Sequence, residues 1–208
     1  MRKIGETLFD ITYLVLLVIF GWYYGQQATV VSKLFAVLTL LLGLGDTCHL
    51  LPRLYKLYRP NWPQAAFWLG FGKLVTSLTL TFFYVFLYIL FFHVSHELPP
   101  SWLNWLVGCL ALSRLLLCLA PANRWFTEKQ PYNWKLYRNL PFFLLGLLVG
   151  ILYQLGGRLN GFGSMGLAIF LSFLFYLPVV LGADRYRALG ALMLPKTCVY
   201  IWIISMGL

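Results

Sequence analysis

The sequence predicts an all-α fold: a single transmembrane domain over residues 1–208, built as an integral membrane bundle of seven transmembrane helices. The first observation is composition, since 61% of the 208 residues are hydrophobic and 11% are charged, which is too apolar for a soluble domain of this size. The second is length. A transmembrane helix needs about 20 mostly apolar residues, and the apolar runs use nearly the whole chain. These runs are too long, and alternate too little, for a β-barrel.

Seven apolar segments follow one another, and their short loops favour antiparallel neighbours. The first follows Met1-Arg2-Lys3 as a signal peptide would, but it is long and no small-residue cleavage site follows Tyr24, so we expect a retained helix. Loops 52–63 and 120–138 mix aromatic and basic residues, which suits the headgroup layer. Pro195 is expected to kink the last span near its middle. In order, the expected spans are 8–25, 29–51, 64–92, 101–119, 139–156, 163–182 and 188–207.

Basic residues are sorted by side and therefore give the orientation. The net charge is +10, and cytoplasmic loops carry an excess of lysine and arginine, whereas the opposite side holds only Lys33 and Arg158. We expect the N-terminus inside and the C-terminus outside, in a bacterial inner (plasma) membrane, with membrane lipids as partners and no nucleic acid. The expected cytoplasmic residues are Arg2, Lys3, Arg53, Lys56, Arg59, Arg124, Lys129, Lys135, Arg138, Arg185 and Arg187.

Two similar pentapeptides place opposite charges inside expected spans. Residues 42–46 read Leu-Gly-Leu-Gly-Asp, and residues 69–73 read Leu-Gly-Phe-Gly-Lys. An ionisable group in hydrocarbon is costly, so each charge marks a candidate functional site. The glycines predict a close approach of the second and third spans. Asp46 and Lys73 would then form either a structural ion pair or a pair that also lines a ligand site.

Four ionisable side chains lie at similar depth in different spans. A helix rises about 1.5 Å per residue, which puts Asp46, Lys73, Arg114 and Lys196 on the order of 9–15 Å from one face, with His49 nearby. Several cations around one carboxylate suit an anion such as a phosphate or carboxylate headgroup. Alternatively, a desolvated lysine loses its proton and acts as a nucleophile or base, or Lys196 extends to the interface.

A polar stripe runs along the third span. Its members, Lys73, Ser77, Thr81, Tyr84 and Tyr88, recur at helical spacing and share one face. Such a stripe is expected to face the bundle interior or a cavity rather than lipid. The alternative is that its hydroxyl groups only join helices together.

The leading hypothesis is a site near the cytoplasmic face that binds or acts on an anionic amphiphile, such as a lipid. Asp46, His49 and Lys73 are the candidate catalytic residues, and Asp46 is the one whose loss is expected to matter most. A lipid-acting hydrolase is one form of this hypothesis. The candidate ligand-binding residues are Lys73, Ser77, Thr81, Tyr84, Arg114 and Lys196.

No metal site is expected. Asp46 and His49 could form half of one, but the other two histidines, His93 and His96, lie beside Glu97 at the opposite side of the membrane. Two other function classes stay open, a transporter of a small anion or a proton-coupled solute and a non-catalytic assembly subunit. The absence of an inverted repeat in the sequence weighs against the transporter.

Gly45-Asp46, with the aromatic-rich span that follows, resembles the lysoplasmalogenase family of polytopic membrane hydrolases. The resemblance covers the second and third spans and implies a catalytic role for Asp46, although that family is drawn with eight helices. The chain is also similar to a group of bacterial polytopic membrane proteins marked by Gly-x-Gly-Asp-x-x-His-Leu-x-Pro-Arg, here Gly43 to Arg53, and by Pro-Lys-Thr-Cys, here Pro195 to Cys198. This second resemblance supplies no function.

A lysine in the seventh span also makes the chain similar to rhodopsins. A retinal Schiff base at Lys196 would need a carboxylate counterion, and the third span offers Lys73 in the usual place. We therefore expect no cofactor.

Overall fold

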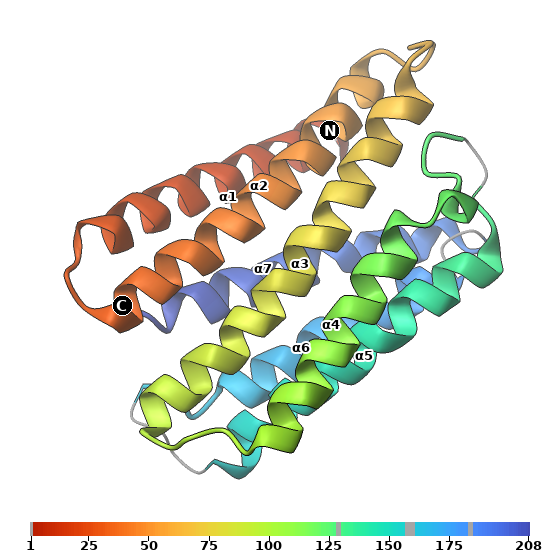
Figure 1. Ribbon diagram of the computed structural model, residues 1–208. Coiled ribbons are helices and arrows are strands. Elements are labelled where there is room, and N and C mark those ends of the chain that lie inside the picture. The colour runs from red at the N-terminus through yellow and green to blue at the C-terminus, as the bar shows by residue number, and fades with distance from the viewer. Residues whose placement is uncertain (1, 128–129, 157–160, 183–184) are drawn as a thin grey trace.

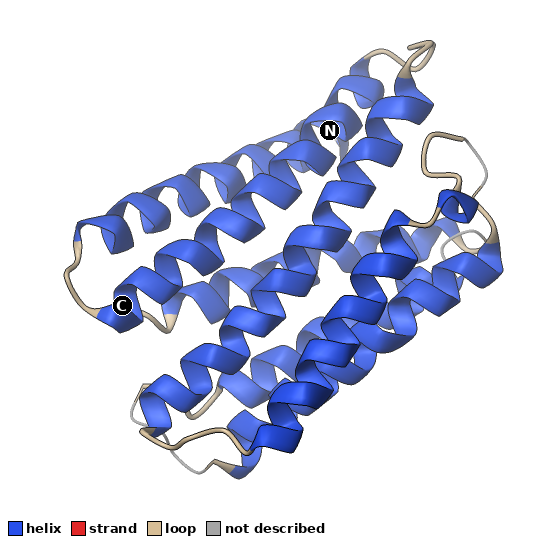
Figure 2. Cartoon of the chain, in the orientation of Figure 1, coloured by secondary structure: helices blue, strands red, loops and turns tan. Residues whose placement is uncertain are grey.

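A computed structural model describes residues 2–127, 130–156, 161–182 and 185–208 of the chain. Within these residues the fold is helical without strands, and seven helical spans are long and apolar enough to cross a membrane (Figures 1 and 2). The predicted all-α fold with seven helices of membrane-spanning length and hydropathy is therefore confirmed for the described residues. The helices are α1 (Arg2–Gln26), α2 (Val30–Tyr58), α3 (Ala65–Ser95), α4 (Ser101–Leu119), α5 (Tyr132–Leu155), α6 (Met165–Gly182) and α7 (Met193–Ser205), with 3₁₀ helices η1 (Pro121–Asn123) and η2 (Arg187–Leu192).

Helix α3 lies at the centre of the bundle (Figure 1). It packs most extensively on α2 and also contacts α4 and α5. Tyr84 of α3 hydrogen-bonds Ser172 of α6 at 3.0 Å, and Phe83 packs edge-on against Tyr200 of α7. Helix α1 packs on α2 and α7, and α6 packs on α5 and α7. Every other span therefore reaches α3 directly or through one neighbour.

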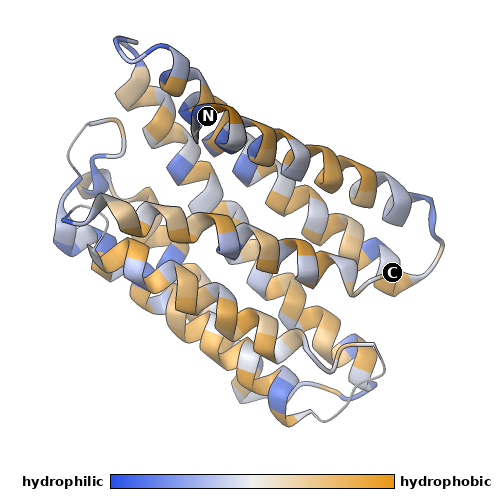
Figure 3. Cartoon of the chain, turned by 180° about the vertical axis from the view of Figure 1, so that it is seen from behind, coloured by the Kyte–Doolittle hydropathy of each residue, from blue (hydrophilic) through white to orange (hydrophobic). Residues whose placement is uncertain are grey.

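The two ends of the bundle differ in charge. One end carries the start of α1 and the α2–α3, α4–α5 and α6–α7 connections, and the C-terminus lies at the other (Figure 1). We call the first the basic end, because most of the residues used above for the orientation belong to it; of those residues, Lys129 and Arg158 lie outside the described part of the chain. The middle of the helices is mainly hydrophobic and the hydrophilic residues collect toward the ends (Figure 3).

Several helices extend further at the basic end than predicted. Helix α1 begins at Arg2 rather than at 8, α2 continues through Pro52 to Tyr58 rather than ending at 51, and α5 begins at Tyr132 rather than at 139. These additional turns are polar, so their hydropathy does not mark them as part of a span. Polar contacts between helices, described below, hold them in place.

Two predictions for single residues are wrong. Pro195 is the third residue of α7, which follows the 3₁₀ helix η2, so it lies in the first turn rather than in the middle of a kinked span. A proline in the first turn removes an N–H that has no partner within the helix. Arg138 was expected in loop 120–138 but belongs to α5, where it is buried, and its guanidinium stacks on Trp125 at 4.0 Å and donates to Asn123 at 2.7 Å.

The predicted close approach of α2 and α3 is confirmed at two of the four glycines. A Cβ on Gly45 would meet Thr76 and Thr79 of α3, and a Cβ on Gly72 would lie 2.7 Å from the Cα of His49. The Thr76 hydroxyl donates to the Gly45 carbonyl oxygen at 2.7 Å, a contact that only closely spaced backbones permit. Gly70 instead packs against the backbone of Trp125, and Gly43 faces Leu17 of α1.

Candidate functional site

Helices α1 and α2 meet through two polar contacts in one register. The Arg53 guanidinium pairs with the Glu6 carboxylate at the basic end. The Tyr13 hydroxyl donates to the Asp46 carboxylate at 2.5 Å further into the bundle. Because seven residues separate the two contacts on each helix, both belong to the same antiparallel pairing of one face with the other. Asp46 therefore has its hydrogen-bond partner on α1.

Between these contacts the register brings Asp10 level with His49. Asp10 lies one turn after Glu6, and His49 lies one turn before Arg53. Asp10 is 2% exposed, and among the described residues neither its Oδ2 nor the Nδ1 of His49 has a hydrogen-bond partner, although both atoms are buried. Unpartnered buried polar atoms are rare in folded proteins, and two at one level of one interface mark a local exception.

Helix α7 adds a cation beyond Asp46. Lys196 is 9% exposed, and its ammonium group lies 4.6 Å from the ring centre of Tyr176 and 5.0 Å from that of Tyr200. It is close enough to Asp46 for the two charges to attract each other. Aromatic faces and one carboxylate thus stabilise Lys196 together. The structure brings these two predicted site residues into one cluster.

Arg114 lies in a second polar cluster, between α3, α4 and α5. Its Nε donates to the Thr81 hydroxyl at 2.9 Å, and its Nη1 donates to the Arg138 carbonyl at 2.7 Å and to the Asn139 side chain at 3.4 Å. The guanidinium stacks on Phe142 at 3.8 Å and is 1% exposed. Each of these acceptors is neutral, so among the described residues Arg114 joins three helices through uncharged partners. Tyr176 donates to Asn139 at 2.7 Å and links this cluster to Lys196.

The polar stripe of α3 divides between the interior and the surface. Thr81, Tyr84 and Tyr88 are buried and their hydroxyl groups bond to neighbouring helices or to the previous turn. Ser77 donates to the carbonyl of Lys73, one turn earlier. The Lys73 side chain is exposed, in electrostatic range of His49. The expected inward orientation is thus confirmed for the deeper part of the stripe and wrong for Lys73, because α3 turns that face outward at the basic end.

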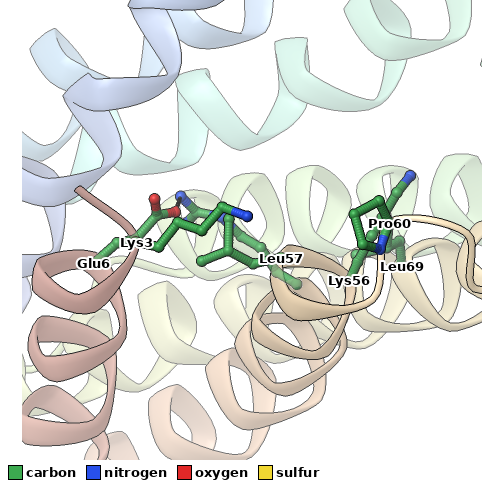
Figure 4. A pocket seen from close by; sticks show the side chains of 7 residues that line it. Lys3, Glu6, Lys56, Leu57, Pro60 and Leu69 are labelled. Atoms are coloured by element: carbon green, nitrogen blue, oxygen red, sulfur yellow. Dashed lines mark hydrogen bonds and ion pairs between the residues drawn. The ribbon is translucent and has the colours of Figure 1, made fainter. Parts of the chain in front are cut away.

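A groove lies at the basic end between α1, α2 and the start of α3. We call it the basic groove, and its volume is about 410 Å³. Figure 4 shows Lys3 and Glu6 on the α1 side and Lys56, Pro60 and Leu69 on the other. Three cations and one carboxylate surround an apolar floor, and the carboxylate is the one that pairs with Arg53. The lining residues are Lys3, Glu6, Arg53, Lys56, Leu57, Pro60 and Leu69.

A second groove, of about 700 Å³, lies along the opposite face of α2. Its aromatic residues include Tyr55, Tyr58 and Trp62, and the rings of Tyr55 and Trp62 meet edge-on at 4.7 Å. Arg59 lies over the Tyr55 ring at 5.8 Å, and the Tyr58 hydroxyl bonds to Thr7 of α1 at 2.8 Å. This surface fits the headgroup layer of a membrane, where aromatic rings and cations collect.

Comparisons with protein-family models, with curated proteins and with solved structures found no match to this chain. In the described part of the chain, no three His, Cys, Asp or Glu side chains are grouped so that they could hold a metal ion. The site must therefore be interpreted from its own residues.

Sequence reasoning overlooked the contribution of α1. Glu6, Asp10 and Tyr13 follow one another at spacings of four and three, and Leu17 continues the same face. That spacing is the helical signal that could have predicted a polar face opposite Asp46, His49 and Arg53. The expected first span, 8–25, excludes Glu6 but includes Asp10 and Tyr13, so only Glu6 depends on where that helix begins.

Proposed function

We propose that this protein is a multi-pass protein of the cell membrane that binds an anionic amphiphile at its cytoplasmic face. The basic end of the bundle is the cytoplasmic end in this proposal. The bias of lysine and arginine toward the loops at that end supports the orientation, since such residues are retained in the cytoplasm. The C-terminus then lies outside.

The observation that carries the proposal is the composition of the basic groove. Among the described residues that line it, Lys3, Arg53 and Lys56 outnumber the one carboxylate, that of Glu6, which already pairs with Arg53. An anionic headgroup gains from several cationic donors that converge on it, and a guanidinium binds phosphate or carboxylate through two hydrogen bonds. The apolar floor offers a surface for the first carbons of an attached chain.

In this proposal the ligand binds at the edge of the bundle rather than among the ionisable residues inside it. The donors of Arg114 are used by neighbouring helices, which favours a structural role for that residue. Lys73 lies one turn after Leu69 on the same face of α3 and extends the cationic surface from the groove toward His49. Asp46 and His49 lie one to two turns deeper on α2, and a catalytic role for them stays a prediction.

Lipid binding by the purified protein tests the proposal. Phosphatidylglycerol and phosphatidylcholine with identical chains are titrated separately, and retained lipid is counted by native mass spectrometry. We expect phosphatidylglycerol to bind more tightly, and a Lys3→Gln/Lys56→Gln variant to lose about 2 kcal/mol of that affinity, at about 1 kcal/mol for each cation near an anionic surface. That loss is close to thirtyfold.

Lys33→Gln is the matched control, because Lys33 is an exposed lysine of α2 at the opposite end of the bundle. It should leave the affinity unchanged. Equal affinity of the wild-type protein for the two lipids, or equal losses in the two variants, would remove the proposal.

A second candidate function is proton-coupled transport of a small solute. It is favoured by the series of titratable groups that continues from the groove through Asp10 and His49 to Asp46 and Lys196. Solute uptake into liposomes that is abolished by Asp46→Asn would support it. If liposomes that contain the wild-type protein take up no solute under either an inward or an outward pH gradient, this function is refuted.

A further inference from the structure

Two buried polar atoms at the interface of α1 and α2 lack a hydrogen-bond partner among the described residues and therefore indicate a binding position. Asp10 Oδ2 and His49 Nδ1 are buried, lie on facing helices at one level, and have no hydrogen-bond partner in the described protein. An unsatisfied buried polar atom destabilises the folded state, and in folded proteins an ordered water molecule commonly satisfies it. Water fits both atoms whichever nitrogen of His49 carries the proton, since water donates and accepts.

The charged groups that face this level have other partners or lie at other levels. On α2, Arg53 is paired with Glu6 one turn toward the groove. On α7, Lys196 faces the rings of Tyr176 and Tyr200. On α3, the Lys73 side chain reaches the surface. Each exerts a field on Asp10 or His49, but none is hydrogen-bonded to the two unpartnered atoms. A neutral polar ligand therefore suits the position better than a further ion.

The position also joins two parts of the site. Arg53, His49 and Asp46 follow one another on one face of α2 at spacings of four and three, so the Cβ atoms of neighbours in this series lie about 5–6 Å apart. Two consecutive hydrogen bonds of about 2.8 Å through one water molecule span such a distance. Past Asp46 the interface becomes apolar, with Leu17 and Leu42 buried.

We propose that water molecules bound along this face, one of them between Asp10 and His49, complete a hydrogen-bonded path from the basic groove to the Tyr13–Asp46 pair. Protons reach Asp46 from the basic end through water, Asp10 and His49, which can each accept and release a proton, whereas Arg53 keeps its proton and only borders the path. The buried leucines beyond Asp46 close the route to the opposite end. The path gives Asp46 one-sided access to solution, which acid–base chemistry and proton-coupled transport each require. The inference rests on the α1–α2 interface alone, so it stands or falls separately from lipid binding.

Exchange of the Tyr13 hydroxyl proton with water tests the path. In the full-length protein in lipid nanodiscs, this proton is identified by NMR as the signal that Tyr13→Phe removes. We expect Asp10→Leu and His49→Phe to slow its exchange about tenfold or more, since each removes one hydrogen bond of the path. Thr39→Val is the control, because Thr39 is a buried polar residue of α2 that bonds only to its own helix. Unchanged exchange in both path variants would overturn the proposal.

A comparison within the wild-type protein covers the case in which a path variant does not fold. Tyr153 is also buried, and its hydroxyl donates to the Leu87 carbonyl at 3.0 Å. We expect the Tyr13 proton to exchange at least about tenfold faster than the Tyr153 proton, because its hydrogen-bonded path reaches solution. Equal rates, or slower exchange at Tyr13, would overturn the proposal.

Discussion

Gly72→Ala should destabilise the bundle, because α2 and α3 have no room for a methyl group at this position. The added Cβ would press on the carbonyl oxygen of Cys48 and lie 2.7 Å from the Cα of His49, against an ordinary contact of 3.4–4 Å. These atoms belong to backbone, so no side chain can rotate away. Overpacking costs about 1–3 kcal/mol, and backbone contact places this variant at the upper end. The higher helix propensity of alanine than of glycine offsets about 1 kcal/mol of this cost. The free energy of unfolding should therefore fall by about 2 kcal/mol in Gly72→Ala.

Gly43→Ala makes the same chemical change without the clash. Its Cβ would lie 3.9 Å from Leu17, in ordinary contact, so propensity alone should stabilise this variant by up to about 1 kcal/mol. The free energy of unfolding of both variants, measured by reversible unfolding in mixed micelles, should therefore differ by about 3 kcal/mol. Equal values would show that α2 and α3 do not approach each other at Gly72, and the packing argument would fail.

Three further predictions concern polar contacts. Arg114→Met should lower the unfolding free energy by about 2–4 kcal/mol, since it removes the hydrogen bonds of a buried cation to acceptors on α3 and α5. An unchanged value would refute this role. Tyr13→Phe should lower the free energy of unfolding by about 1–3 kcal/mol, because it removes the hydrogen bond to the Asp46 carboxylate. A decrease below about 0.5 kcal/mol in the same assay would show that this hydrogen bond does not stabilise the fold. Glu6→Gln and Arg53→Gln in a double-mutant cycle should give a coupling energy below about 1 kcal/mol, because the pair is partly exposed; a larger value would mean that it is shielded from water.

The number and order of spans could be predicted from the sequence because both depend on local hydropathy. Apolar runs of the required length are visible without any knowledge of neighbours. The ends of α1 and α2 could not be predicted in this way. Their polar turns are held by contacts such as Glu6 with Arg53, which depend on how two helices pair.

Part of the arrangement of the candidate site residues could be predicted from residue spacing along each helix. The approach of α2 and α3 followed from Gly45 and Gly72, and helix spacing placed Thr81 and Tyr84 in the interior. The partner of Asp46 was not foreseen, since depth along a helix says nothing of rotation about its axis. Lys73 has the predicted position along α3, but its side chain is exposed.

The two polar clusters of the bundle differ in how completely their hydrogen bonds are made among the described residues. Around Arg114 a buried cation meets three neutral acceptors and an aromatic face, so it can hold α3, α4 and α5 together without a ligand. Around Asp10 and His49 two buried atoms have no partner among the described residues. Helix packing alone would favour apolar side chains at such positions, because an unsatisfied polar atom costs free energy. Their presence beside a cationic groove is therefore not explained by helix packing, and the proposed proton path gives both atoms a partner.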